Sequence, residues 1–249
     1  MDVAIIGSGN VATVLGKLIA KEHKVVHVCS RNPEHAAILA REFHCNHTGL
    51  EPVNQINADL YLISVSDAAI ENIVGFHVHD KLVVHTAGSV SMDVLKNVSH
   101  HHGIIYPLQS LRKEMEMVPQ IPLLVDGNTA ESFYRIEAFA KTISPDVKRA
   151  DDDQRLKLHT AAVIVSNFTN HLYSMAEEFC EKEQVDFNLL KPLIMETATR
   201  IQNESPSKLQ TGPALRKDIQ TLDKHLRLLN NYPKLRTTYL RLTDSIMNG

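Results

Sequence analysis

The sequence has few cysteines, no cluster of basic residues and no membrane-length apolar segment, and each absence excludes a class of protein. Its three cysteines, Cys29, Cys45 and Cys180, are widely spaced without a C-x-x-C pattern, so no disulfide framework is expected. Lysine and arginine are dispersed and the formal net charge is -3, which argues against binding to nucleic acid or an anionic membrane. The chain opens on an apolar strand rather than a signal peptide or membrane span. We therefore expect a cytoplasmic protein.

Histidine is abundant, with fourteen in 249 residues, and the run His100-His101-His102 raises the question of a metal site. Consecutive residues point in different directions, and no carboxylate or further histidine has ligand spacing on one face. No metal is therefore predicted, and the run is interpreted as a solvated loop.

Short apolar strands alternate with helices through the first part of the chain. Strands are expected at 3–7, 25–29, 45–48, 60–65, 81–86, 103–106, 123–126 and 147–150. Helices are expected at 11–20, 36–43, 67–74 and 129–141. This alternation predicts an α/β fold, with a doubly wound, mostly parallel Rossmann sheet over residues 1–150.

The pattern changes after residue 145. Asp151-Asp152-Asp153 would begin a helix that runs without glycine or proline to about Glu183, with an apolar centre at 161–165. Three more helices are expected near 188–203, 213–230 and 234–247. Residues 151–249 are therefore predicted to form an all-helical domain. The apolar centre must be covered on every side, by the rest of a bundle or by another subunit.

A glycine-rich turn separates the first strand from the first helix. Gly7-Ser8-Gly9-Asn10-Val11-Ala12 has the form G-x-G-x-x-A, in which glycines permit a tight turn and close approach of a pyrophosphate. The helix N-terminus adds free N–H groups and partial positive charge. Residues 7–11 are thus predicted to bind a dinucleotide, and the alternative is a Rossmann fold that has lost its nucleotide.

The residues at the end of the second strand indicate whether the cofactor is NAD(H) or NADP(H). An NAD enzyme usually carries an acidic residue there, but this chain has Ser30-Arg31-Asn32. The hydroxyl of Ser30 and guanidinium of Arg31 suit a 2'-phosphate, so NADP(H) is the predicted cofactor. Alternatively, Arg31 only stacks on the adenine.

The carboxyl ends of the strands at 60–65 and 81–86 lie at the sheet edge where such folds bind ligands. Ser64, Val65, Ser66 and Ala87 are expected to line the nicotinamide half of the cofactor site. His85 is a candidate substrate contact or a structural histidine. Asp67 is interpreted mainly as a helix cap.

These motifs resemble the superfamily of pyrroline-5-carboxylate reductase, ketopantoate reductase and the beta-hydroxyacid dehydrogenases. More narrowly, the sequence is similar to the Rossmann-like proteins with domain of unknown function 2520. The motifs that carry this similarity are His85-Thr86-Ala87-Gly88, Tyr106-Pro107-Leu108-Gln109-Ser110, His159-Thr160-Ala161-Ala162, Ser166-Asn167 and Thr211-Gly212-Pro213 with Arg216 and Asp218. The resemblance implies an NADP-dependent oxidoreductase, commonly dimeric through the helical domain, and supplies no substrate.

One departure from the superfamily concerns catalysis. Beta-hydroxyacid dehydrogenases carry a lysine one turn before an asparagine on the first long helix, but the residue four before Asn167 is Val163. In using Ser166 and the Thr-Gly-Pro turn, the chain resembles pyrroline-5-carboxylate reductases better.

The helical domain supplies further candidates. His159 would donate a proton, while Ser166 and Asn167 would hydrogen-bond the substrate, and a seven-residue spacing puts His159 and Ser166 on nearly one helix face. Thr211 would cap a helix that begins at Pro213 and binds an anion, with Arg216 pairing a substrate carboxylate. Tyr106 and Gln109 are weaker candidates for the wall of the cleft. For several of these residues, polar packing inside a helical bundle is an equally ordinary explanation.

The leading hypothesis is therefore an NADP(H)-dependent oxidoreductase acting on a small carbonyl, imine or hydroxy acid, as a homodimer through the helical domain. The alternative is a non-catalytic NADP(H)-binding sensor or scaffold, which the missing lysine favours. Hydride exchange with a deazaflavin is a third possibility, suggested only by superfamily kinship.

Overall fold

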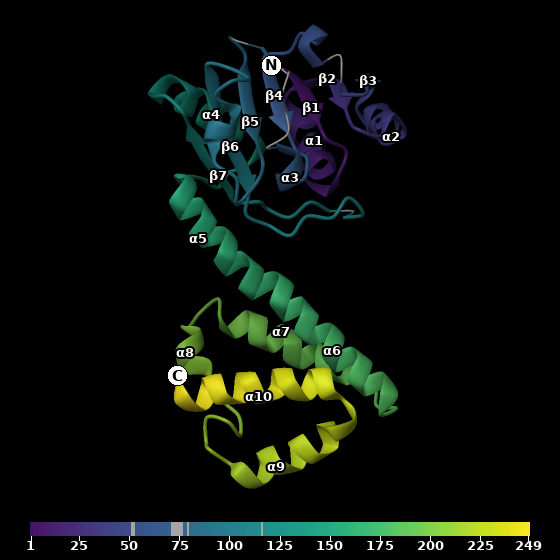
Figure 1. The fold of residues 1–249 in the computed structure, drawn as a ribbon, viewed down its shortest axis with the longest axis vertical. Coiled ribbons are helices and arrows are strands. Elements are labelled where there is room, and N and C mark those ends of the chain that lie inside the picture. Colours follow the sequence, from purple (N-terminus) through teal and green to yellow (C-terminus); the bar gives the residue numbers. More distant parts are fainter. Residues whose placement is uncertain (51–52, 71–76, 79, 116) are drawn as a thin grey trace. The chain divides into compact units, whose positions relative to one another are not determined.

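The computed structural model describes the chain except for residues 51–52, 71–76, 79 and 116. It divides into two compact units, Met1–Ser166 and Asn167–Gly249, which are described separately (Figure 1). The boundary between units falls within the long helical stretch that was predicted to open the second domain.

In the first unit, eight strands of the described residues form one sheet. They are β1 (Asp2–Ile6), β2 (Lys24–Cys29), β3 (Asn46–Thr48), β4 (Leu60–Ile63), β5 (Leu82–His85), β6 (His101–Pro107), β7 (Leu123–Gly127) and β8 (Val147–Arg149). Their order is β3-β2-β1-β4-β5-β6-β7-β8. The β6–β7 pair is antiparallel and the other pairs are parallel. This confirms the doubly wound, mostly parallel sheet.

Helices cover both faces of this sheet and enclose two apolar clusters. One cluster joins the sheet to α1 (Asn10–Glu22), α2 (Pro33–Phe43) and α4 (Ala130–Ile143). The other lies between the opposite face of the sheet and α3 (Asp67–Ile70) with η2 (Met92–Leu95). A further short helix is η1 (Val53–Gln55). Alternate residues of the central strands enter opposite clusters, as Val3 and Ala4 do in β1, which explains why these strands are continuously apolar.

Polar caps define where the helices of the first unit begin. The Asn32 side chain accepts from the amides of Glu34 and His35 at the start of α2. Asp151 and Gln154 form a capping box at the start of α5 (Asp152–Ala162), where the acidic run predicted a helix N-terminus. The long helix predicted from this run is therefore confirmed at its beginning.

That long helix continues beyond α5 with a change of winding. Residues Val163–Phe168 form a π-helical segment, η3, and α6 (Thr169–Lys182) follows. In a π-helix each N–H pairs with the carbonyl five residues earlier, so the side chains change phase across the segment. The prediction that His159 and Ser166 share one face assumed continuous α-helical spacing, and that assumption was wrong.

The second unit is helical, as predicted. After α6 it contains η4 (Phe187–Leu190), α7 (Lys191–Arg200), α8 (Pro206–Leu209), α9 (Ile219–Leu228), η5 (Leu229–Asn231) and α10 (Pro233–Asn248). The predicted helix start at Pro213 was wrong. Gly212 is a bend, residues 213–217 form turns, and α9 begins after Asp218, whose side chain accepts from the Thr221 amide.

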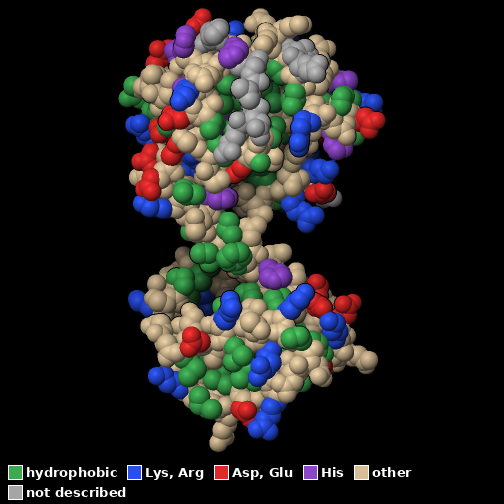
Figure 2. Space-filling model, viewed as in Figure 1, with side chains coloured by type: hydrophobic (Ala, Val, Ile, Leu, Met, Phe, Trp, Pro, Cys, Tyr) green, Lys and Arg blue, Asp and Glu red, His purple; other side chains and the backbone are tan. Residues whose placement is uncertain are grey.

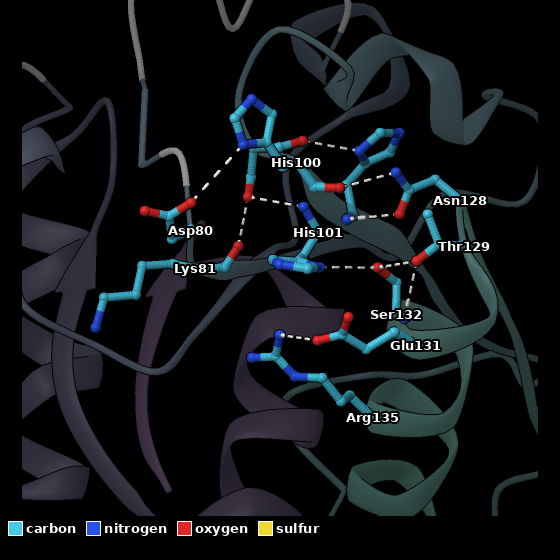
Figure 3. A network of polar contacts seen from close by, with 11 residues as sticks. Asp80, Lys81, His100, His101, Asn128, Thr129, Glu131, Ser132 and Arg135 are labelled. Atoms are coloured by element: carbon cyan, nitrogen blue, oxygen red, sulfur yellow. Dashed lines mark hydrogen bonds and ion pairs between the residues drawn. The ribbon is translucent and has the colours of Figure 1, made fainter.

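The histidine run also differs from its prediction. His101 and His102 begin β6 and pair with Leu82 and Val83 of β5, and His102 is buried, so a solvated loop was wrong for both. Figure 3 shows how polar neighbours satisfy the run: His101 Nδ1 lies 3.4 Å from Ser132 Oγ, and Asn128 bonds the His100 carbonyl and the His102 amide. The described residues contain no grouping of three potential metal ligands.

For α3 the expected length cannot be compared, because 71–74 of the predicted 67–74 lie outside the described residues. Within the described part of the chain, no helix combines the length and apolar character needed to cross a bilayer.

Candidate functional site

Two glycines give the β1–α1 turn its shape. Gly7 has a φ of +128°, and a Cβ here would lie 2.1 Å from the carbonyl oxygen of Ser64 in the neighbouring chain segment. Gly9 is the N-cap of α1, and a Cβ there would have no atom within 4 Å. The turn is therefore closed toward the sheet at Gly7 and open at Gly9.

The N-terminus of α1 beside Gly9 has no polar cap among the described residues. No side chain accepts from its first amides, and its first turn has no acidic residue. Such a helix end offers unpaired N–H groups and a partial positive charge to an anion. Open space at Gly9 and these uncapped amides of Asn10 and Val11 fit the pyrophosphate of a dinucleotide.

At the end of β2, Ser30 is connected to the glycine-rich turn. The hydroxyls of Ser8 and Ser30 lie 2.8 Å apart, and Ser30 is 8% exposed. Arg31 is exposed, and within the described part of the chain no carboxylate forms an ion pair with it. Asn32 uses its side-chain oxygen to cap α2, so its predicted cofactor contact is limited to its amide nitrogen and backbone. Ser8, Ser30 and Arg31 thus form a polar corner suited to a phosphate.

The loops after β4 and β5 are bonded to each other at the same edge of the sheet. Thr86 Oγ1 donates to Ser64 Oγ at 3.3 Å, and the Thr86 amide donates to the Ile63 carbonyl. Ser64 and Ala87 are buried, Val65 is half-buried and Ser66 is exposed. The residues predicted to line the nicotinamide half therefore lie together at the carboxyl edge of the strands, next to Gly7.

His85 ends β5 and is fully buried, at 0% exposed. Its Nδ1 accepts from the Ala87 amide at 3.2 Å, which leaves the proton on Nε2 to bond the Ser91 carbonyl at 3.3 Å. Burial lowers the pKa of His85 to about 4, so its ring is neutral near pH 7. Because both ring nitrogens are occupied, this geometry favours the structural interpretation over substrate contact.

Asp67 begins α3 and accepts a short hydrogen bond from Ser89 Oγ. This contact joins the loop after β4 to the loop after β5, and the helix-cap role that the sequence favoured for Asp67 stays a prediction. It places a negative charge near the end of β6.

Tyr106 of β6 contacts His159 of α5, and the ring of His159 packs over Gly88. The Tyr106 hydroxyl lies 2.8 Å from His159 Nδ1, and the two rings meet edge to face. A Cβ on Gly88 would lie 2.6 Å from His159 Nδ1, so only glycine leaves room for this ring. Burial and the charge of Asp67 raise the pKa of Tyr106, which keeps its hydroxyl protonated. His159 and Tyr106 are both half-buried and therefore accessible to a ligand.

Arg155 anchors the start of α5 one turn before His159. It is 1% exposed, lies 2.9 Å from an Asp152 carboxylate oxygen and donates a short hydrogen bond to the Val90 carbonyl. Its Nε has no hydrogen-bond partner among the described residues. The buried cation therefore fixes α5 against the loop after β5 and so positions His159.

The remaining predicted residues fall into two groups. Gln109 is exposed at the start of the β6–β7 connection and accepts from the Ser110 amide. Ser166 is half-buried, and both it and Asn167 lie in the π-helical segment, a feature that occurs frequently at functional sites.

Thr211 and Arg216 lie in the second unit, where Gly212 has a φ of +110°. Since the turn that carries them does not begin a helix, the predicted helix-end anion site is absent there. Substrate contacts of Ser166, Asn167, Gln109, Thr211 and Arg216 stay predictions.

Sequence reasoning named Tyr106 only as a weak candidate and did not pair it with His159. The sequence contains one signal for this pair, Gly88, which has no side chain. Its role becomes visible only when the structure shows that the ring of His159 packs over it. Arg155 gave no sequence signal, because a charged residue on a helix is ordinarily solvated.

Residues 121–246 match the domain of unknown function 2520, and residues 2–88 match the family of coenzyme F420-dependent NADP oxidoreductases. A Bacteroides fragilis protein of known structure, described as a candidate NADP oxidoreductase, is 36% identical with a TM-score of 0.91, over 100% of this chain and 98% of that one. A search of the curated proteins finds no match.

More distant structures share the fold. A pyrroline-5-carboxylate reductase from Streptococcus pyogenes has 12% identity and a TM-score of 0.62, over 100% of this chain and 99% of that one. A reductive aminase from Aspergillus terreus, in complex with NADPH and ethyl-5-oxohexanoate, has 15% identity and a TM-score of 0.65, over 99% and 90%. Together, the matched domain and the 36% identical relative show that this chain belongs to the domain of unknown function 2520 family, among the candidate NADP oxidoreductases.

Proposed function

We propose that the chain is an NADP(H)-dependent oxidoreductase that acts on a small carbonyl, imine or hydroxy acid. The observation that carries this proposal is that an open, uncapped helix end at Gly9 and a Tyr106–His159 pair both lie at the carboxyl edge of the sheet in one unit. When bound, the nicotinamide supplies or accepts a hydride. The chain's own residues then have to hold the phosphates, orient the substrate and move a proton.

The phosphates would be held from two sides. The amides at the start of α1 would bind the pyrophosphate, and Ser30 and Arg31 would bind the 2'-phosphate that distinguishes NADP(H) from NAD(H). The family match over residues 2–88 and the 36% identical relative support NADP(H) as the cofactor.

His159 would move the proton. In the tautomer where the Tyr106 hydroxyl donates to Nδ1, the ring proton is on Nε2, the nitrogen remote from Tyr106. That proton can pass to an oxygen or nitrogen of the substrate, and Tyr106 can stabilise the change of charge on the ring. Histidine is the side chain that most often transfers protons in this way.

Turnover of wild type and two variants tests this assignment, with NADPH oxidation followed against small ketones and imines and NADP+ reduction followed against hydroxy acids. His159→Gln should lower kcat about 10²- to 10⁴-fold, the usual contribution of a general acid. Tyr106→Phe should lower it less and move its pH dependence, because the ring loses a hydrogen-bond partner. NADPH affinity should stay within about twofold in both, since neither residue lies in the phosphate corner.

Unchanged turnover in His159→Gln would dismiss the catalytic role. Tight NADPH binding by wild type without turnover of any substrate would favour a sensor or scaffold. That function is also compatible with Val163, which stands where beta-hydroxyacid dehydrogenases carry their catalytic lysine.

We also propose that the second unit pairs with a second copy of the chain. Its buried hydrophobic residues are only Cys180, Ala214, Leu222 and Leu229, and all of its residues are described. Its exposed apolar side chains include Val185, Leu189, Leu193 and Met195, with Leu189 77% exposed. Figure 2 shows hydrophobic side chains on the visible surface of this unit. A small core and a large apolar surface are typical of helical units completed by a subunit interface.

Sedimentation equilibrium tests the dimer. Wild type should sediment as a dimer, and Leu193→Glu, which puts a charge on the 63% exposed Leu193, should shift it toward monomer. Lys191→Glu on the same helix, a charge change at a polar position, is the control. A monomeric wild-type protein would contradict the proposal.

A further inference from the structure

The connection between β6 and β7 is unusually long for an antiparallel pair. Neighbouring antiparallel strands are commonly joined by loops of about two to five residues, but here residues 108–122 intervene. Figure 1 shows the described residues of this strap, 108–115 and 117–122, as an extended trace that leaves the β6–β7 edge and passes across the unit toward α1. Long loops in compact domains usually have a function of their own.

The strap is held in place at both ends and in the middle. Leu111 and Ile121 are buried in the apolar cluster that contains α1, and Val118 packs against it. The Leu108 amide donates to the Pro122 carbonyl at 2.9 Å, closing the base of the strap. Its tip therefore has a defined position relative to α1.

That tip contacts the glycine-rich turn. The Lys113 amide donates to Asn10 Oδ1 at 3.2 Å, and Asn10 is the first residue of α1. Two segments a hundred residues apart in sequence are thereby joined at the predicted cofactor site. Lys113 is exposed, and no described carboxylate forms an ion pair with it.

Lys113 also lines a cavity of about 210 Å³ with Ser8, Lys17, His35 and Glu42. Lys17 is neutralised by Glu42 at 3.2 Å, so Lys113 is the cation in this lining that has no described carboxylate partner. Ser8 connects the cavity to Ser30 through their hydroxyl pair. At about 30 Å³ per water, the cavity has room for a phosphate group.

We propose that Lys113 is a specificity-determining residue for the cofactor, and that the strap holds its ammonium against the 2'-phosphate of NADP(H). The inference rests on the proposed function and adds a second cation to the Ser30–Arg31 corner. A phosphate monoester carries close to two negative charges at neutral pH, so a single arginine does not neutralise it. Arg31 from the β2–α2 turn and Lys113 from the strap would bind it from two different segments.

Titration calorimetry with four ligands tests this role. The ligands are NADPH and 2',5'-ADP, which carry the 2'-phosphate, and NADH and 5'-AMP, which lack it. In Lys113→Gln the Kd for the first pair should rise about tenfold, because a charge-assisted contact is lost, while the second pair should stay within about twofold. The variant should also show a weaker salt dependence of NADPH binding.

Arg112→Gln is the matched control. Arg112 is the neighbouring exposed cation on the strap, is paired with Glu114 and does not line the cavity, so its loss should change no Kd by more than about twofold. Melting temperatures of both variants should equal that of wild type, because both side chains are exposed.

Three outcomes would overturn the inference. Unchanged binding of all four ligands by Lys113→Gln would show that Lys113 does not contact the cofactor. Equal weakening of NADPH and NADH would move its contact to a group that both share. If the wild-type protein bound neither NADPH nor NADH, the proposed function would fail as well. If the preference for NADPH over NADH were lost in Arg31→Gln but kept in Lys113→Gln, only the inference about the strap would fail.

Discussion

Replacing the two glycines of the β1–α1 turn by alanine should separate folding from cofactor binding. Gly7→Ala places a methyl group 2.1 Å from the Ser64 carbonyl and forces alanine to a φ of +128°. Backbone strain of this kind costs about 1–3 kcal/mol, and overpacking adds about 1–3 kcal/mol. The sum, about 2–6 kcal/mol, is a large part of the roughly 5–15 kcal/mol that stabilises a typical domain.

Gly9→Ala should behave differently, because its methyl group points into open space. Alanine is a poorer N-cap than glycine, so a loss of about 0.5–1 kcal/mol is expected. NADPH binding should nevertheless weaken more than tenfold, since the methyl group would occupy the position of the closely approaching pyrophosphate.

Thermal melting and calorimetric titration of both variants measure these effects. At about 2–4 °C per kcal/mol, Gly7→Ala should melt roughly 4–24 °C below wild type and Gly9→Ala less than about 4 °C below it. Gly49→Ala is a control, because a Cβ there also has no atom within 4 Å. Wild-type NADPH affinity in Gly9→Ala would refute the assignment of the pyrophosphate to this turn, and an unchanged melting temperature in Gly7→Ala would refute the packing argument.

Two further predictions concern the residues that support the site. In the unfolded chain His85 is protonated below about pH 6.5, whereas in the folded chain it stays neutral down to about pH 4. The free energy of unfolding should therefore decrease by up to about 3 kcal/mol as the pH falls through this interval. Denaturation curves should show a smaller acid loss in His85→Asn, and equal pH dependence in both proteins would contradict the role of burial. Arg155→Leu should cost about 1–3 kcal/mol in urea unfolding, because the buried Val90 carbonyl loses its donor. Arg155→Leu with wild-type stability would show that the buried cation does not anchor α5.

The regular part of the fold could be predicted from the sequence because its signals are local. Apolar strands, the glycine turn and the acidic run before α5 each act within a few residues, and all three appear in the structure at the expected places. The π-helical segment could not be predicted, because nothing in the residues 163–168 distinguishes it from an α-helix.

Longer-range contacts account for the other differences. Polar His101 and His102 enter β6 because pairing with β5 decides their conformation, against the local preference for a loop. Thr211-Gly212-Pro213 has the local composition of a helix start, but Asp218 supplies the cap for α9. The Tyr106–His159 contact and the approach of Lys113 to Asn10 join residues far apart in sequence, so only the tertiary structure reveals them.

Calorimetric titration of the purified wild-type chain with NADPH and NADH, after removal of carried-over nucleotide, tests the cofactor assignment most directly. We predict that NADPH binds about tenfold to a hundredfold more tightly than NADH, because its 2'-phosphate meets Ser30 and Arg31, and that Arg31→Asp abolishes this preference. Binding of neither nucleotide, or equal binding of both by wild type, would contradict the assignment.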